Sequence, residues 1–383
     1  MEQKKNKKVA ILTLYYKSLN YGGILQAFAL QNYLETSGYD SRQISYIYDS
    51  GFTNWNYVKY LLHNILIPFY HLMKYKKWEM NFLRRRRKVL KFSNSIPHTK
   101  IVTKKSIGQL SNEFDFFICG SDQIWNPIGW QSTFFLDFIP DKKKKISYAA
   151  SIARDSLTKA ELSFIEPYLY EFSYISVREK NSAILLNEKL SDINIIDVPD
   201  PVFLLNRSQW DIISERGHNK IEGPYIFAYF LGENEENRRK AINFAKKMRL
   251  KIFFVGYTDK KLYGWEISHR DILLSNLGVE DFLKCISKAT IVITDSFHAA
   301  AFSAIFHTPF YALPRFNKTD VNSMNSRLKV LVEELGIEDR FVEDLNNISS
   351  YSWSEDEIKS LECNLLMLKN KGRSYLQKSL GDN

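Results

Sequence analysis

Residues 290–314 read TIVITDSFHAAAFSAIFHTPFYALP, two apolar runs separated by a segment of small residues. The first run, Thr290–Thr294, predicts a buried strand, and Ala299–Phe306 predicts a helix that begins shortly after it. Pro309–Leu313 predicts the next strand. A strand, a helix and a strand in close succession predict a βαβ unit of a parallel sheet.

The turn between this strand and this helix carries polar residues. Asp295 or Ser296 can cap the helix, and the free N–H groups and dipole at its first turn favour an anion. His298 falls in that turn, where an imidazole can transfer a proton. Strand–turn–helix units are common, so this pattern leaves His298 open as a functional, a capping or a surface residue.

The same alternation extends along the chain. Lys8–Leu14 predicts a strand, Ile24–Glu35 a helix that Gly38 ends, and Gln43–Tyr48 a second strand. Further strands are predicted at Asp115–Cys119, Ile146–Ala150, Tyr174–Val177, Tyr225–Phe230 and Lys251–Val255, and further helices at Asn234–Met248, Val279–Ser287 and Ser354–Asn370. The expected fold class is α/β, with two doubly wound, Rossmann-like domains facing a cleft.

Two prolines mark the expected boundary between these domains. Pro199 and Pro201 interrupt any regular element within Asp197–Asn206, which predicts a linker. Residues 1–200 then form the N-terminal domain, with a basic and apolar insertion at about 55–92, and residues 201–353 form the C-terminal domain. Residues 354–383 are expected as a C-terminal helix that packs back on the N-terminal domain.

Charge and cysteine content narrow the function classes. The 383 residues include 53 Lys and Arg against 43 Asp and Glu, a net charge of +10 that favours an anionic partner. Charge alone supports nucleic-acid binding, and no recognised module accompanies it, so no nucleic-acid partner is expected. Cys119, Cys285 and Cys363 are far apart and show neither a disulfide framework nor metal-ligand spacing.

The hydropathy pattern predicts a cytoplasmic protein. No apolar stretch is long enough to span a bilayer, and Val9–Leu14 is too short for a signal-peptide core. Tyr57–Met73 is apolar and runs into cations at Lys74–Lys77 and Arg84–Lys88, the pattern of an interfacial helix on anionic lipid. This predicts salt-sensitive attachment to the inner face of the cytoplasmic membrane. A core-packed helical pair with a solvated basic face is the alternative.

Several short motifs follow one another in a defined order. They are Asn20-Tyr21-Gly22-Gly23 with Leu25–Gln31, Cys119–Asn126, Ser147–Ser151, Ser176-Val177-Arg178-Glu179, Asp200-Pro201, Thr294–His298, and Arg327 with Leu335-Gly336. No single motif is diagnostic, but together and in this order they resemble the polysaccharide pyruvyl transferase family over nearly all of the chain.

The resemblance implies a fold like that of GT-B glycosyltransferases and an enzyme of capsule or exopolysaccharide biosynthesis. Such an enzyme transfers the pyruvyl group of phosphoenolpyruvate to two hydroxyls of a sugar, forms a ketal and releases phosphate, with no metal or cofactor. The implied acceptor is a sugar on a polymer or on an undecaprenyl-diphosphate-linked oligosaccharide. The N-terminal domain is expected to bind this acceptor and the C-terminal domain the donor.

The resemblance also assigns donor residues. His298 matches the histidine near the donor and is expected to transfer a proton, and Arg178 is expected to clamp the donor's anionic groups. An ion pair with Glu179 is the alternative for Arg178, and a solvated helix-start residue is the alternative for Arg327. The full donor set is Arg178, Ser296, Phe297, His298, Arg315 and Arg327.

The chain departs from the family pattern at Ser296. Many members have Arg-Leu-His or Arg-x-His where this chain has Ser296-Phe297-His298. The missing arginine removes one expected donor contact, and Arg315, Lys318 or Arg327 are the candidates to replace its charge.

The acceptor is expected against the first domain. Gly22 and Gly23 permit close backbone approach, and Asp122 follows a strand end as a catalytic base or, alternatively, as a loop-capping residue. The acceptor set is Asn20, Tyr21, Gly22, Gly23, Ser121, Asp122, Gln123, Trp125 and Asn126.

Two other functions remain open from the sequence. A GT-B glycosyltransferase using a nucleotide sugar would share the fold, although the second half shows no clear Glu-x7-Glu donor signature. The departure at Ser296 also leaves room for a non-catalytic relative of the family.

Overall fold

The first domain is built around a parallel sheet. The computed structural model describes residues 7–47, 81–154, 156–218, 220–232, 234–256, 264–316, 325–348 and 351–381. Strands β1 (Lys8–Leu12), β2 (Asp40–Gln43), β3 (Phe116–Cys119) and β4 (Lys145–Ser147) pair in the order β2-β1-β3-β4. Parallel bridges from Ile146 to Tyr174 and from Ala150 to Val177 continue this sheet to β5 (Ile175–Val177) and β6 (Ile195–Asp197). The α-helices of this domain that lie entirely within the described residues are α1 (Tyr21–Thr36), α3 (Lys159–Leu169) and α4 (Lys180–Lys189).

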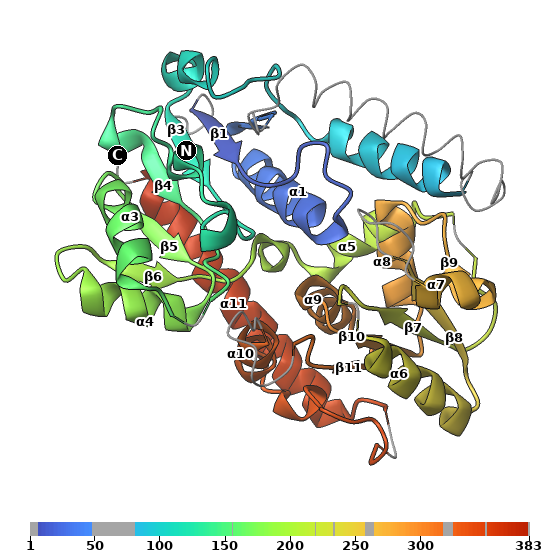
Figure 1. Ribbon diagram of the computed structural model, residues 1–383. Helices are drawn as coiled ribbons and strands as arrows, with labels where there is room; N and C mark the ends of the chain where they lie inside the picture. The colour runs from blue at the N-terminus through green and yellow to red at the C-terminus, as the bar shows by residue number, and fades with distance from the viewer. Residues whose placement is uncertain are drawn as a thin grey trace.

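The second domain repeats the plan with a second parallel sheet. Its strands are β7 (Tyr225–Tyr229), β8 (Lys251–Val255), β9 (Leu273–Leu274), β10 (Ile291–Thr294) and β11 (Phe310–Ala312), in the order β11-β10-β7-β8-β9. Its helices are α5 (Arg207–Ser214), α6 (Glu235–Met248), α7 (Gly264–Ser268), α8 (Val279–Ser287), α9 (Phe297–Phe306) and α10 (Ser326–Glu334). Figure 1 shows the two sheets as separate units. The predicted α/β class with two Rossmann-like domains is confirmed.

Short 3₁₀ turns connect these elements. They are η2 (Ile107–Asn112), η3 (Pro127–Gly129), η4 (Ser132–Phe135), η5 (Lys142–Lys144), η6 (Pro201–Leu204), η7 (Arg270–Ile272) and η8 (Glu338–Arg340). The prolines near residue 200 do break regular structure, but the segment is not an exposed connection. Residues 201–205 are buried and pack against α1. The chain therefore crosses between the domains through the interior.

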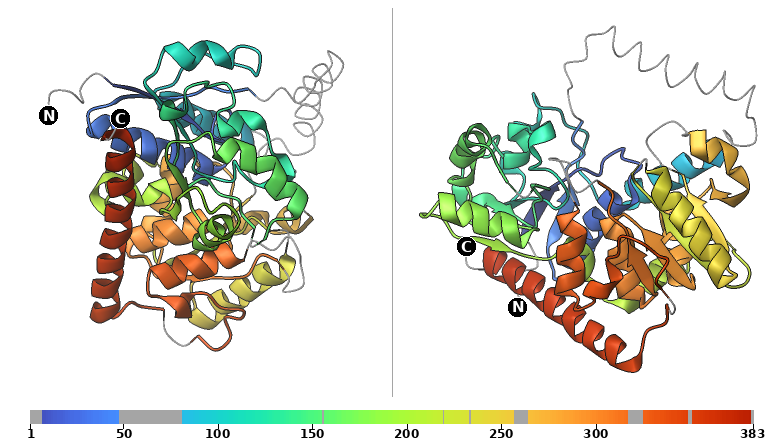
Figure 2. Two further views of the ribbon diagram at one scale, coloured as in Figure 1. Left: turned by 90° about the vertical axis from the view of Figure 1, so that its left-hand side faces the viewer. Right: turned by 60° about the horizontal axis from the view of Figure 1, so that its bottom comes forward.

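The C-terminal helix α11 (Glu355–Gly381) contacts both domains. Tyr375 Oη donates to the carbonyl of Ser147 (2.7 Å) in the first domain, and Asn364 Nδ2 donates to the carbonyl of Leu335 (2.9 Å) in the second. Figures 1 and 2 show the helix running along one side of the molecule past both sheets. It continues beyond the predicted end at Asn370 because Gly372 is helical and buried. A Cβ there would lie 2.4 Å from Tyr148 Oη.

The second strand differs from the prediction. β2 begins at Asp40 and ends at Gln43, whereas Gln43–Tyr48 was expected. From Gln43 to Ile47, where this described range ends, only isolated bridges form, from Gln43 to His98 and from Tyr46 to Val102. Tyr48 lies outside the described residues. The apolar residues that suggested a strand, Ile44 and Tyr46, pack into the core of the first domain without a regular ladder.

A basic helix over residues 81–95 joins the domains. Arg85 Nη1 donates to the carbonyl of Gly256 (2.8 Å), and Lys88 Nζ donates to Asp281 Oδ2 (2.8 Å). These two cations therefore face protein and not lipid, which corrects that part of the predicted membrane-facing cluster. The apolar stretch Tyr57–Met73 and the cations before residue 81 lie outside the described residues. Among the helices that are described, none combines the length and apolar character needed to cross a bilayer.

Candidate active site

The predicted donor residues meet where the carboxyl ends of strands from both sheets face each other. Arg178 follows β5, and Asp200 follows β6 and caps η6. Phe297 and His298 open α9, directly after β10. Ligands of doubly wound sheets bind at this edge. We call the meeting point the crevice.

Arg178 and Asp200 form a buried ion pair in the crevice. Arg178 Nη1 donates to Asp200 Oδ2 (2.9 Å), and both side chains are at most 3% exposed. Burial alone would raise the pKa of Asp200, but the charges of His298 and Arg178 and a hydrogen bond from the Val202 N–H hold it well below its usual range. Asp200 is therefore a fixed negative charge at neutral pH.

His298 lies between this charge and the start of α1. Its Nε2 is 3.5 Å from Asp200 Oδ2, and within the described part of the chain this buried nitrogen has no hydrogen bond of good geometry. Nδ1 lies against Gly22, where a Cβ would come within 2.1 Å of it. The imidazole is held tightly, with one nitrogen left to hold or pass a proton.

Phe297 places two arginines around one ring. The guanidinium carbon of Arg178 lies 4.7 Å from the ring centroid and that of Arg327 lies 5.7 Å from it. Burial, and then the charge of Arg178, lowers the pKa of Arg327 to about 9. Two buried cations that repel each other form a favourable site for an anion.

Glu179 partly balances these cations. Its Oε1 accepts from Arg178 Nε (3.4 Å), lies 3.8 Å from Arg327 Nε and accepts from the Ser151 hydroxyl. Its Oε2 is buried without a hydrogen bond among the described residues. The ion pair between Arg178 and Glu179 thus exists, but the shorter contact of Arg178 is with Asp200.

A small cavity opens beside the two arginines. Its volume is about 20 Å³, enough for roughly one water molecule. Its lining includes Arg178, Asp200, Phe297, Arg327 and Glu334. A ligand larger than a water molecule does not fit this cavity as the described residues shape it.

Ser296 and Arg315 have local partners. Ser296 caps α9 through its hydroxyl, which accepts from the N–H of Ala299 (3.5 Å). Arg315 Nη2 donates to the carbonyl of Asp295 (2.8 Å). The Asp295 carboxylate accepts from the N–H of Gly232 (2.8 Å). Arg315 is near enough to lower the pKa of Arg327, but it does not line the small cavity.

On the acceptor side, Gly22, Gly23, Ser121 and Asp122 reach the crevice. A Cβ on Gly23 would lie 3.2 Å from Asp122 Oδ2, and Ser121 Oγ lies 3.5 Å from Asp200 Oδ2. Asn20 caps α1 by accepting from the N–H groups of Gly22 and Gly23.

Two acceptor predictions need correction. Trp125 is fully buried, stacks on Phe135 and donates its indole N–H to the carbonyl of Phe134. Tyr21 is also fully buried and stacks on Phe282 of the second domain at 4.5 Å. Both rings fill the interior because their large apolar faces pack there, so neither presents a surface to a sugar.

Gln123 and Asn126 bond to each other. Asn126 Nδ2 donates to Gln123 Oε1 (3.1 Å), and Asn126 Oδ1 accepts from the N–H of Ile128. Their polar groups thus stabilise the loop after β3, and both side chains remain half-buried.

Sequence reasoning assigned no role to Asp200 or Ser151, and it considered Glu179 only as an alternative ion-pair partner of Arg178. Asp200 and Glu179 stand in the quoted motifs Asp200-Pro201 and Ser176-Val177-Arg178-Glu179, so the motifs themselves were the available signal. Ser151 Oγ accepts from Arg178 Nη2 (3.0 Å). These three residues contact Arg178, and two of them, Asp200 and Glu179, add negative charge to the crevice.

Comparison with known families shows which family these motifs belong to. The sequence model described as "Polysaccharide pyruvyl transferase" matches residues 20–315, which include Arg178, Asp200 and His298. The chain belongs to the polysaccharide pyruvyl transferase family. Arg327 lies beyond the matched region.

Solved structures place this family member among GT-B folds. The UDP-GlcNAc 2-epimerase from Methanocaldococcus jannaschii is 13% identical, with a TM-score of 0.52 and coverage of 96% of this chain and 93% of that chain. The complex of the Methanocaldococcus jannaschii enzyme with UDP-GlcNAc and UDP is 14% identical, with a TM-score of 0.51 and coverage of 98% of this chain and 100% of that chain. A protein described as a UDP-N-acetylglucosamine 2-epimerase from Listeria monocytogenes is 10% identical, with a TM-score of 0.52 and coverage of 99% of this chain and 97% of that chain.

At these identities the likeness shows the fold alone. The pyruvyl transferase family member has the two-domain, Rossmann-like GT-B architecture that the resemblance implied. A search of curated proteins gave no match.

Proposed function

We propose that this protein transfers the pyruvyl group of phosphoenolpyruvate to two hydroxyls of a sugar, forming a ketal and releasing phosphate. The observation that carries the proposal is the pair of buried arginines around Phe297, with His298 and Asp200 beside them.

The donor has a carboxylate and a phosphate, and each arginine can hold one of them. A guanidinium presents planar, paired N–H donors that match both groups. The lowered pKa of Arg327 supports this assignment, since an arriving anion would relieve its repulsion with Arg178. Donor binding on this proposal widens the crevice, because the present cavity holds about one water molecule.

The reaction needs three proton transfers, one onto carbon 3 of the donor and one from each of the two sugar hydroxyls. A proton adds to carbon 3 of the enol, and the first hydroxyl adds to carbon 2 and gives up its own proton. The bond between carbon 2 and the phosphate oxygen then breaks with its electron pair going to phosphate, and the second hydroxyl takes its place. One hydroxyl proton replaces the proton given to carbon 3, and the other leaves with phosphate.

His298 is the proposed proton donor to carbon 3. The Asp200 carboxylate lies 3.5 Å from Nε2. Asp122 is the proposed base for a sugar hydroxyl, because its carboxylate lies near the glycines at the start of α1. The proposal requires no metal or cofactor.

The proposed acceptor is an undecaprenyl-diphosphate-linked oligosaccharide or polymer of a capsule or exopolysaccharide, modified at the inner face of the membrane. Arg84 and Arg87 are exposed on the basic helix and can contact anionic lipid. Neutralising both, with Arg85 left intact, should weaken salt-sensitive binding to anionic vesicles. Equal binding by this variant would remove the membrane part of the proposal.

The test is phosphate release and product mass with phosphoenolpyruvate and a panel of lipid-linked glycans. The product should gain one pyruvyl ketal, and His298→Ala should abolish the gain. His307→Ala is the matched control, because His307 caps the far end of the same helix. Turnover of a nucleotide sugar in place of phosphoenolpyruvate, or full activity of the His298 variant, would overturn the proposal.

A further inference from the structure

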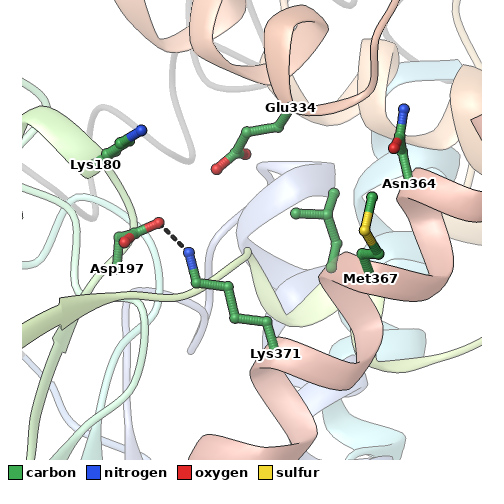
Figure 3. Close-up of a pocket in the computed structure, with 7 residues that line it drawn as sticks. Lys180, Asp197, Glu334, Asn364, Met367 and Lys371 are labelled. Carbon is green, nitrogen blue, oxygen red and sulfur yellow. Dashed lines mark hydrogen bonds and ion pairs between the residues drawn. The ribbon is translucent and has the colours of Figure 1, made fainter.

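A second, larger pocket lies next to the crevice, between α4, α10 and α11. Its volume is about 290 Å³, close to the lower end of the range for small-molecule sites. Figure 3 shows the side chains that line it, with Lys180, Glu334 and Lys371 turned towards a common space. We call it the α10–α11 pocket.

The α10–α11 pocket is contiguous with the crevice. Glu334 lines both cavities. Arg327 and Glu334 stand seven residues apart on α10, which places them on one helix face about 10 Å from each other. On the opposite wall, Asp197 ends β6 and Lys180 begins α4, next to Arg178 and Glu179 of the crevice. The pocket therefore lies along the same ligand-binding edge of the sheet.

The polar groups of the pocket keep unused hydrogen-bonding capacity. Lys371 is paired with Asp197, as the dashed line in Figure 3 marks. Within the described ranges, no hydrogen bond or ion pair within normal limits reaches the Lys180 ammonium or the Glu334 carboxyl group. Burial raises the pKa of Glu334 to about 7, so near neutral pH this group can both donate and accept.

This inventory fits a neutral polyhydroxylated ligand better than an ion. Asp197 already matches the charge of Lys371, so an anion would find one spare cation facing a second carboxyl group. The two lysine ammonium groups that line the pocket would repel a metal cation. A sugar ring uses ammonium and amide donors, carboxyl acceptors and a small apolar face, and Met367 and Leu368 of α11 supply the last.

We propose that the α10–α11 pocket binds a neutral sugar ring of the acceptor glycan, adjacent to the ring that reacts in the crevice. The identification of this saccharide as part of the acceptor glycan rests on the proposed function. The binding of a neutral saccharide in the pocket does not rest on it, because that inference follows from the residues of the pocket itself.

Direct binding tests the pocket first. The probes are neutral mono-, di- and trisaccharides of hexoses and N-acetylhexosamines, observed by saturation-transfer NMR and calorimetry with the full chain. Lys180→Ala and Glu334→Gln should weaken oligosaccharide binding by about 3- to 10-fold each, the effect of one or two lost hydrogen bonds. The matched controls are Lys189→Ala on α4 and Glu333→Gln on α10, both exposed and outside the pocket lining.

Steady-state kinetics then separates the subsite from the donor site. The two pocket variants should raise KM for the glycan. Lys180→Ala, whose side chain does not line the crevice cavity, should leave KM for phosphoenolpyruvate within about twofold. Unchanged glycan binding in both variants, or displacement of the saccharide by inorganic phosphate, would overturn the subsite. A rise in KM for phosphoenolpyruvate alone would instead make the pocket part of the donor site and also overturn it. Saccharide binding that persists in a protein without phosphate release would support the subsite while the proposed function fails.

Discussion

The crevice and the α10–α11 pocket share Glu334 but treat charge in opposite ways. In the crevice, Arg178 contacts both Asp200 and Glu179, all three are buried, and the cavity beside them is about 20 Å³. In the pocket, Lys180 stands without an ion pair among the described residues and the volume is about 290 Å³. Preorganised charge suits a small, highly charged donor, whereas spare hydrogen-bonding groups suit an uncharged ligand.

Removing the central charge of the crevice should have the largest effect. Asp200→Asn leaves the buried Arg178 without its closest partner, so we expect the free energy of unfolding to fall by about 3–5 kcal/mol. The pKa of Asp200 is lowered in the folded protein, so its stabilisation is present above the unfolded pKa near 4 and is lost as pH falls further. Denaturant titrations at pH 7 and pH 3 should show the difference between variant and parent shrinking at acid pH.

The exposed pair of Asp211 and Arg207 is the control for this change. Its carboxylate is 46% exposed and 3.8 Å from the guanidinium, so Asp211→Asn should alter stability by less than about 1 kcal/mol. An equally small change for Asp200→Asn would mean that the crevice is not a preorganised charge network.

Changing the shape of a cation without its charge tests donor recognition. Arg178→Lys keeps a positive charge but loses the planar fork, so we expect kcat/KM to fall by roughly 10²- to 10³-fold. The effect is measured by isothermal titration calorimetry with phosphoenolpyruvate and by initial reaction rates. The corresponding Lys180→Arg change in the pocket should leave kcat/KM for phosphoenolpyruvate nearly unchanged. A comparable loss of kcat/KM in the Lys180 variant would mean that the crevice and the pocket do not differ in donor recognition.

A single methyl group tests how tightly the imidazole is held. Gly22→Ala places a Cβ 2.1 Å from His298 Nδ1, so the ring must leave its present position beside Asp200. We expect a stability loss of about 1–3 kcal/mol and a large loss of turnover, measured by thermal unfolding and phosphate release. Gly129→Ala, where nothing lies within 4 Å, is the matched control. A fully active Gly22 variant would contradict the proposed position of the catalytic proton.

The smallest expected effect is a gain of stability in the pocket. The folded-state pKa of Glu334 is raised to about 7, so the parent loses stability as pH rises from about 4.5 to 7. Glu334→Gln removes this loss and should be more stable by about 1–2 kcal/mol above pH 7, with no difference below pH 4.5. The charges that face Glu334 are Lys371, Asp197, Lys180 and Glu333, and all remain in the variant. A pH-independent difference would contradict the burial of this carboxyl group.

Local pattern predicted the frame of the molecule well. The bounds of β8 and α8 are those expected, because strong apolar periodicity and nearby turn residues define them within a few positions. The motif around His298 also placed the imidazole beside the interdomain crevice. These features depend on neighbours in the chain, which a sequence displays directly.

What the sequence did not reveal depends on contacts between distant segments. Trp125 looked like an exposed aromatic after a strand end, but Phe135 covers it. Asp200 looked like part of a linker, and its role arises only because Arg178 and His298 fold onto it. The α10–α11 pocket draws its walls from four elements, so no single motif could indicate it.

The long helix at the C-terminus sets a mechanical condition on catalysis. It is hydrogen-bonded to the first domain through Tyr375 and to the second through Asn364, so separating the two domains would break at least one of these contacts. Widening the space around Phe297 must either break one of these two hydrogen bonds or move the helix together with one domain. The rate at which substrates enter would then depend on contacts of the C-terminal helix, which is distant in sequence from His298.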